Sequence, residues 1–152
     1  MNFEIKNIKK NYGKKMPLCD VSFDVLPSRC VGILGKNGSG KSTLLSVLAG
    51  VQKCSGGEFC LDGEDLFQNR KRLCDIVGYV PQGTPLFEEL SAKDNLLLWY
   101  DKKTLREELY CGVLKMLGID EFVGGGVTCQ TDRKAHLAVA LGFVCRPRIG
   151  LA

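Results

Sequence analysis

The segment Gly35-Lys36-Asn37-Gly38-Ser39-Gly40-Lys41-Ser42 constrains the fold of this chain more than any other stretch. It matches the pattern G-x-x-x-x-G-K-[ST] at every fixed position, and that pattern is typical of a loop that holds phosphate groups. Its glycines let the backbone curl, so that successive N–H groups converge on phosphate oxygens. A helix that starts at the end of the loop adds its positive dipole end and its unpaired N–H groups.

Two residues at the end of this loop have distinct expected roles. Lys41 supplies a mobile positive charge for the β- and γ-phosphates, and the Ser42 hydroxyl is placed to ligate Mg²⁺. The alternative is a Gly-rich turn that binds nothing. The flanking sequence favours the phosphate loop, because the apolar run Cys30–Leu34 predicts a buried strand before it and Ser42–Ala49 predicts a helix after it.

Periodicity predicts the remaining elements. Period-two alternation indicates strands over Phe3–Ile8 and Val21–Val25, and Asp62-Gly63 is a hairpin signal after Glu58–Leu61. A further apolar run predicts a buried strand over Asp75–Val80.

Helical signals dominate the second half. Ser91 and Asp94 resemble a capping box, and Thr104–Leu117 has the spacing of one helix that ends at Gly118. Arg133–Arg146 predicts a last helix. Residues 148–152 look like the opening of another strand. Strands followed by a strand–loop–helix and a helical block indicate an α/β fold with an antiparallel edge.

Composition limits the classes of protein to consider. The chain has 152 residues, of which 45% are hydrophobic and 25% charged, so a disordered polyelectrolyte, a collagen-like repeat and a coiled coil are excluded. The formal net charge of +4 arises after residue 132, from Arg133, Lys134, Arg146 and Arg148. Four charges without interleaved aromatics favour a solvated helix face over nucleic-acid binding, so we expect no nucleic-acid partner.

The cysteine pattern and the N-terminus point to a reducing compartment, and the hydropathy argues against a membrane span. None of the eight cysteines forms a C-x-x-C pair and the chain has one histidine, so we expect free thiols and no zinc site. The N-terminus lacks the apolar region of a signal peptide. No stretch reaches the roughly 20 apolar residues of a membrane span, so any work at a membrane requires a partner.

Four motifs in order carry a family resemblance. With Tyr12, the loop at 35–43, Ser55-Gly56-Gly57-Glu58 and Tyr79-Val80-Pro81-Gln82, the chain resembles the ATP-binding domain of ABC transporters over about residues 1–122. The resemblance implies a P-loop NTPase core with an N-terminal antiparallel β-subdomain, part of a helical subdomain and an incomplete sheet. It also implies a single partial domain over 1–152, with the β-subdomain and P-loop core at 1–85 and a helical region at 86–146.

The resemblance assigns site residues one by one. Tyr12 would stack on adenine, the alternative being a strand-end tyrosine that packs on the core. Gln82 would contact Mg²⁺ or the attacking water, the alternative being a solvated loop glutamine. Lys41 and Gln82 would be catalytic, and Ser42 and Gln82 would hold the metal. The remaining ATP contacts would come from the Walker A loop: Gly35, Asn37, Gly38, Ser39, Gly40, Lys41, Ser42 and Thr43.

The resemblance also implies a function and partners. The chain would be the ATP-binding subunit that couples ATP binding and hydrolysis to transport, with ATP and Mg²⁺ as cofactors. A transmembrane permease and a second nucleotide-binding subunit would be its partners, and the cytoplasmic face of the cell membrane its location. Pro85-Leu86-Phe87 and the following helix would dock the permease, with ordinary core packing as an equal alternative.

The resemblance fails after about Phe122. The family needs an LSGGQ-type signature, but Val123–Gly126 lacks the serine and Cys129–Arg133, at the expected spacing, does not match. No Asp or Glu follows Asp132 to serve as the Walker B carboxylates, and His136 is too early to be the switch histidine.

Asp101 follows an apolar run and imitates a Walker B aspartate, but the flanking helix signals favour a helix end. The expectation is therefore a truncated or frame-disrupted ABC ATPase. A non-catalytic nucleotide-binding or interaction module is an alternative. Another P-loop enzyme, such as a small-molecule kinase, is disfavoured by the Ser-Gly-Gly-Glu and Val-Pro-Gln elements.

Overall fold

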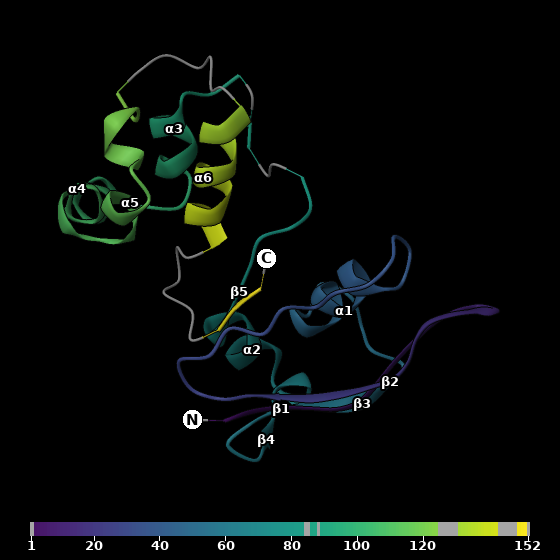
Figure 1. Cartoon of the computed structure of the whole chain (residues 1–152). Helices are drawn as coiled ribbons and strands as arrows, with labels where there is room; N and C mark the ends of the chain where they lie inside the picture. The colour runs from purple at the N-terminus through teal and green to yellow at the C-terminus, as the bar shows by residue number, and fades with distance from the viewer. Residues whose placement is uncertain (1, 84–85, 88, 125–130, 143–148, 152) are drawn as a thin grey trace. The chain divides into compact units, whose positions relative to one another are not determined.

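The computed structural model describes residues 2–83, 86–87, 89–124, 131–142 and 149–151 (Figure 1). The chain divides into two compact units, Met1–Val77 and Gly78–Ala152. The first unit carries the phosphate loop and the second carries most of the helices.

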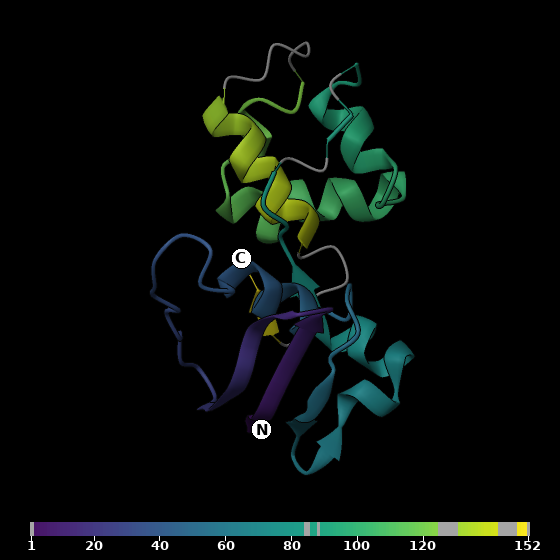
Figure 2. The same ribbon diagram turned by 90° about the vertical axis from the view of Figure 1, so that its right-hand side faces the viewer.

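A four-stranded antiparallel sheet forms the base of the first unit. Its strands are β1 (Phe3–Tyr12), β2 (Lys15–Val25), β3 (Gly56–Leu61) and β4 (Glu64–Asp65), in the order β2-β1-β3-β4. Figures 1 and 2 show β1, β2 and β3 running side by side. The two strands predicted by alternation are confirmed, and both are longer than predicted because their ladder continues to a tight turn at residues 13–14.

Alternation sends Phe3 and Ile5 of β1 into the core, and an irregularity in the strand pairing between Ile5 and Ile8, where Asn7 has a φ of 51°, brings Ile8 to the same side. Phe3, Ile5 and Ile8 are buried, and Phe59 of β3 is fully buried. The Phe3 and Phe59 ring centroids lie 5.9 Å apart, and Phe67 meets Phe59 edge-on at 6.0 Å. Aromatic pairs at these separations add to the stability given by burial alone.

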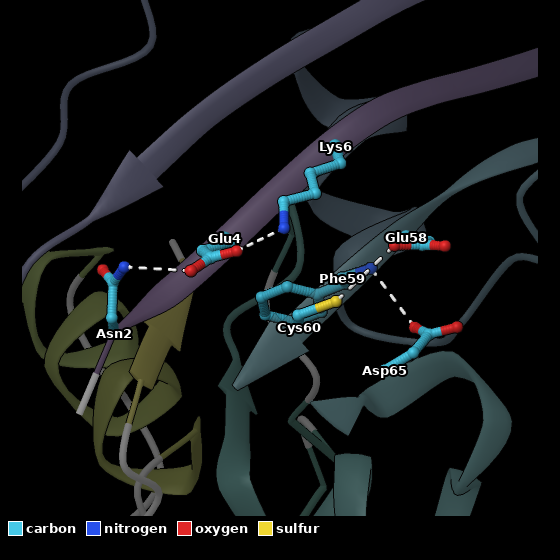
Figure 3. A network of polar contacts seen from close by, with 7 residues as sticks. All are labelled: Asn2, Glu4, Lys6, Glu58, Phe59, Cys60 and Asp65. Atoms are coloured by element: carbon cyan, nitrogen blue, oxygen red, sulfur yellow. Dashed lines mark hydrogen bonds and ion pairs between the residues drawn. The ribbon is translucent and has the colours of Figure 1, made fainter. Parts of the chain in front are cut away.

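Polar side chains lie along the neighbouring strands β1 and β3 (Figure 3). Lys6 pairs in register with Glu58 and forms an ion pair with Glu4 on its own strand. The Lys6 ammonium, which donates a hydrogen bond to Glu4, lowers the pKa of the Glu4 carboxyl below 4.5. Burial raises the pKa of the Cys60 thiol, which faces Glu58 at 3.9 Å. Opposite charges across paired strands favour this register.

The hairpin signal at Asp62-Gly63 is confirmed. Both residues have positive φ, 48° and 89°, as a two-residue turn of the primed type requires, and they join β3 to β4. A short 3-10 helix (Leu66–Gln68) and α2 (Arg70–Ile76) follow.

The strand predicted over Asp75–Val80 is present only as β5 (Val77–Tyr79). Asp75 and Ile76, the first two residues of the predicted strand, instead form the end of α2. That helix begins after Asn69, whose side chain accepts from the Arg72 N–H at 3.1 Å.

The strand predicted over Cys30–Leu34 is wrong. Residues 30–36 form no helix or strand, and Leu34 is 96% exposed. A strand buried on both faces needs a neighbouring strand at each edge. Among the residues that the structure describes, no strand pairs with this segment, so Val31 and Leu34 are exposed and Ile33 is only half-buried.

The second unit is a cluster of helices (Figures 1 and 2). Its elements are α3 (Ala92–Leu97), α4 (Lys102–Cys111), α5 (Val113–Met116), a 3-10 helix (Ile119–Glu121), α6 (Thr131–Gly142) and β6 (Ile149–Leu151). They share one apolar core: Ala92, Leu96, Tyr100, Leu105, Leu114, Ile119, Leu137 and Ala140. β6 pairs with β5, which confirms the strand expected at 148–152.

Helix ends in this unit follow local side-chain chemistry. Ser91 caps α3 by accepting from the Asp94 N–H at 3.0 Å, as the capping signal predicts. The single helix predicted over Thr104–Leu117 is instead two helices that meet at Gly112. The buried Glu108 carboxylate accepts from the Val113 N–H at 2.9 Å at the start of the second helix. This side-chain bond takes the place of the backbone hydrogen bond that Val113 would make in a continuous helix.

Within the described ranges, no helix combines the length and the apolar character that a membrane crossing requires.

Candidate functional site

The phosphate-loop segment stands at the start of α1 (Lys41–Leu48), and this helix confirms the one predicted over Ser42–Ala49. The loop turns at two glycines with positive φ, Gly38 at 81° and Gly40 at 93°. The Ser39 N–H closes a turn on the Lys36 carbonyl at 3.2 Å. α1 has no acidic residue in its first turn, so nothing there opposes an anion at its positive end.

Gly40 lies where the loop touches the sheet. A Cβ on this residue would meet the Pro17 carbonyl oxygen at 2.6 Å and the Leu18 side chain at 3.1 Å. The Gly40 carbonyl accepts the first helical hydrogen bond, from the Leu44 N–H at 2.8 Å. Gly40 is therefore fixed by two requirements, its left-handed backbone and its close approach to β2.

Lys41 lies across the loop. Its ammonium donates to the Gly35 carbonyl at 2.7 Å and to the Lys36 carbonyl at 2.8 Å. The positive charge is thereby held over the curled backbone, where phosphate groups of a ligand would sit. Ser42 is exposed at the first turn of α1 and Thr43 is half-buried beside it.

These residues can supply part of a magnesium site. Magnesium in nucleotide sites takes one or two protein oxygens, with the remaining ligands from phosphates and water. The Ser42 hydroxyl is such an oxygen, and it belongs to the same turn of helix as Lys41. Among the described residues, no group of three or more His, Cys, Asp or Glu side chains could hold a metal by itself.

Tyr12 ends β1 and is 47% exposed, and both its stacking on adenine and its packing on the core stay predictions. Its hydroxyl donates to Gln52 Oε1, and the Lys10 ammonium lies 5.0 Å from the ring centroid. Lys10 stands opposite Leu18, which contacts Gly40, and Tyr12 is two residues further along the strand. Two residues of a strand span about 7 Å, so Tyr12 lies about that far along β1 from Lys10, the residue opposite Leu18. Tyr12 and the Gly40 side of the phosphate loop therefore lie near the same end of the sheet.

Sequence reasoning missed Lys10 and Gln52. No pattern in the sequence marks them, because their contact with Tyr12 depends on how the segment after α1 returns to β1.

The other predicted site residues belong to the second unit. Gln82 is exposed in a bend after β5, and its role toward the loop stays a prediction. Leu86 packs against the helical core, whereas Phe87 is 58% exposed. The buried Asn95 side chain bonds both the N–H and the carbonyl of Phe87, at 2.9 and 3.0 Å, and so fixes this segment. Pro85 lies outside the described residues.

The remaining candidates have plain structural roles or lie outside the description. Asp101 caps α4 by accepting from the Lys103 and Thr104 N–H groups at 2.9 and 3.0 Å. His136 is an exposed residue of α6. Residues 125–130, which include most of the degenerate signature region, lie outside the described residues.

Comparisons with known proteins show what this chain is similar to. The family model described as ABC transporter matches residues 18–149. A solved chain titled as an ATP-binding subunit of an ABC transporter superposes with a TM-score of 0.79, covering 99% of this chain and 65% of its own length. The two chains share 21% sequence identity, so this similarity shows the fold alone.

Curated relatives agree with the family model. A sulfate/thiosulfate import ATP-binding protein, CysA, of Bacillus cereus is 32% identical over 98% of this chain and 44% of its own length. A linearmycin resistance ATP-binding protein, LnrL, of Bacillus subtilis is 34% identical over 63% of this chain and 31% of its own. The chain thus spans less than half the length of these relatives.

Proposed function

This chain belongs to the ABC transporter family, and from that premise we propose that it binds Mg²⁺–ATP at the loop formed by residues 35–43. The observation that carries the proposal is the loop itself. It curls at Gly38 and Gly40, ends at the start of α1 and holds the Lys41 ammonium over its carbonyls. Each of these features favours a bound polyphosphate.

Each loop residue has a proposed contact. Backbone N–H groups of Gly35, Asn37, Gly38, Ser39, Gly40 and Thr43 surround the phosphates. Lys41 neutralises the β- and γ-phosphates, and the Ser42 hydroxyl ligates the magnesium ion. Tyr12 stacks on the adenine, and Gln82 contacts the metal or the attacking water, as the family resemblance implies. Magnesium supplies charge neutralisation on the phosphates when it is bound.

The proposed role in the cell is that of the ATP-binding subunit of a transporter. A transmembrane permease and a second nucleotide-binding subunit are the proposed partners, at the cytoplasmic face of the membrane. The relatives include an import protein and a resistance protein, and we propose no transported substrate. Phe87, exposed on a segment fixed by Asn95, is the proposed permease contact.

Calorimetric titration of the chain with Mg²⁺–ATP tests the proposal. Lys41→Ala removes a charge-assisted phosphate contact and should weaken binding about tenfold or more. Lys36→Ala, in the same loop, is the matched control and should change affinity less than about threefold. Equal affinities of the two variants, or a folded chain that does not bind Mg²⁺–ATP, would overturn the proposed function.

A further inference from the structure

Tyr12 is held on two sides by residues that the family resemblance does not assign. Its hydroxyl donates to Gln52 Oε1, and the Lys10 ammonium lies over its ring. Lys10 is itself tethered, because its ammonium donates to the Lys53 carbonyl at 2.6 Å. An aromatic ring has two faces, so a cation on one of them leaves the other as the face on which a base can stack.

The segment of residues 51–55 is bonded to β1. The Ser55 N–H donates to the Lys9 carbonyl at 2.7 Å, and the Asn11 N–H donates to Ser55 Oγ at 3.0 Å. Together with the Gln52 and Lys53 contacts, these bonds fix the segment along the last four residues of the strand. Tyr12 is therefore not a freely rotating side chain at a strand end.

The same segment is bonded to the helix of the phosphate loop. The Gln52 N–H donates to the Ser46 carbonyl at 3.1 Å, and Ser46 Oγ donates to the Ser42 carbonyl at 2.8 Å. Gln52 thus accepts from the Tyr12 hydroxyl through its side chain and donates to α1 through its backbone. A continuous series of contacts runs from Tyr12 to the residue proposed to ligate magnesium.

We propose that Gln52 and Lys10 are positioning residues that hold Tyr12 as a one-sided platform for the nucleotide base. The proposal rests on the proposed function, because it deepens the base-binding half of the same site. The ring is ordered before the ligand arrives, so binding costs less conformational entropy. Lys10 and Gln52 act through Tyr12 and contribute to recognition of the base but not of the phosphates.

The test compares two ligands that differ in the base. Mg²⁺–ATP carries a base and a triphosphate, whereas Mg²⁺–tripolyphosphate carries phosphates alone. In calorimetric titrations of the full chain, Gln52→Met and Lys10→Met should each weaken ATP binding about two- to tenfold. Both should bind tripolyphosphate as the unaltered chain does. Lys10→Arg, which keeps a cation over the ring, should restore most of the ATP affinity.

Lys9→Met is the matched control for Lys10→Met. It removes the same charge from the neighbouring residue, whose side chain leaves β1 on the opposite face, and it keeps the backbone carbonyl that Ser55 uses. It should bind both ligands normally. A loss equal to that of Lys10→Met would mean that net charge, not position over the ring, governs affinity, and would overturn the assignment of Lys10.

A double-mutant cycle tests Gln52 directly. Tyr12→Phe keeps the ring and removes the hydroxyl, so Gln52→Met should have no further effect on ATP binding in that background. Equal weakening of ATP and tripolyphosphate by Gln52→Met would indicate a general structural role and overturn the inference.

The two proposals fail in different ways. If Lys41→Ala weakens ATP binding while Gln52→Met and Lys10→Met do not, the platform inference fails and the proposed function stands. If the unaltered chain binds no ATP, both fail.

Discussion

Gly40→Ala perturbs the loop at the point where it touches the sheet. The backbone of Gly40 has a φ of 93°, and a left-handed conformation costs an L-residue about 1–2 kcal/mol. The new Cβ would also lie 2.6 Å from the Pro17 carbonyl oxygen, a backbone atom that no side-chain rotation can move. Overpacking of this kind adds about 1–3 kcal/mol, so the total cost is about 2–5 kcal/mol.

Gly38→Ala isolates the backbone part of this cost. Gly38 has a φ of 81°, but a Cβ there would meet no atom within 4 Å. It should therefore cost only about 1–2 kcal/mol. The difference between the two variants, about 1–3 kcal/mol, measures the contact of the loop with β2.

Urea unfolding followed by far-UV circular dichroism is the assay. With a slope of about 2 kcal/mol per molar urea, the Gly40→Ala midpoint should lie about 0.5–1.5 M below that of Gly38→Ala. Coincident midpoints, or a lower midpoint for Gly38→Ala, would refute the view that the loop is packed against β2.

Three further predictions concern the helical unit. Asp101→Ala should lower the thermal midpoint near neutral pH, because it removes the cap of α4. Hydrogen bonds from Thr104 lower the pKa of the Asp101 carboxyl below 3.8 in the folded chain. The loss of stability should therefore be full above pH 3.8 and should vanish as the pH falls through the lowered pKa. A pH-independent loss in thermal scans would contradict this. Asn95→Leu should cost about 2–4 kcal/mol in urea unfolding followed by tryptophan fluorescence, since it leaves the Phe87 backbone unpaired; unchanged stability would oppose it. Leu96→Ala should cost about 2–5 kcal/mol in the same assay and Phe87→Ser less than about 0.5, whereas similar losses would contradict their burial.

Features that depend on a few neighbouring residues could be predicted from the sequence. The Asp62-Gly63 turn needs only two residues with positive φ. Ser91 caps its helix three residues away, and Gly118, with a φ of 67°, follows the last turn of α5. The helix of the phosphate loop was predictable for the same reason, because the loop pattern includes its first turn.

Features that depend on distant partners could not be predicted. The apolar run at residues 30–34 reads as a buried strand, but a strand forms only when another one pairs with it. The break at Gly112 depends on Glu108, whose carboxylate turns back to cap the second helix, and a periodic apolar face hides that event. At the site, the position of Lys10 over Tyr12 depends on the register of the sheet. The contact of Gln52 with Tyr12 depends on how the segment after α1 returns to β1. Neither event has a sequence signature.

The position of β1 in the middle of its sheet has a consequence for synthesis on the ribosome. β2 follows β1 after a tight turn, so that hairpin can pair as soon as residue 25 emerges. The other edge of β1 waits for β3, which begins at residue 56. At about 5–20 residues per second, residues 26–55 take about 1.5 to 6 s to add. During that interval the nascent chain presents one unpaired edge of a ten-residue strand, the kind of edge that pairs readily with other chains.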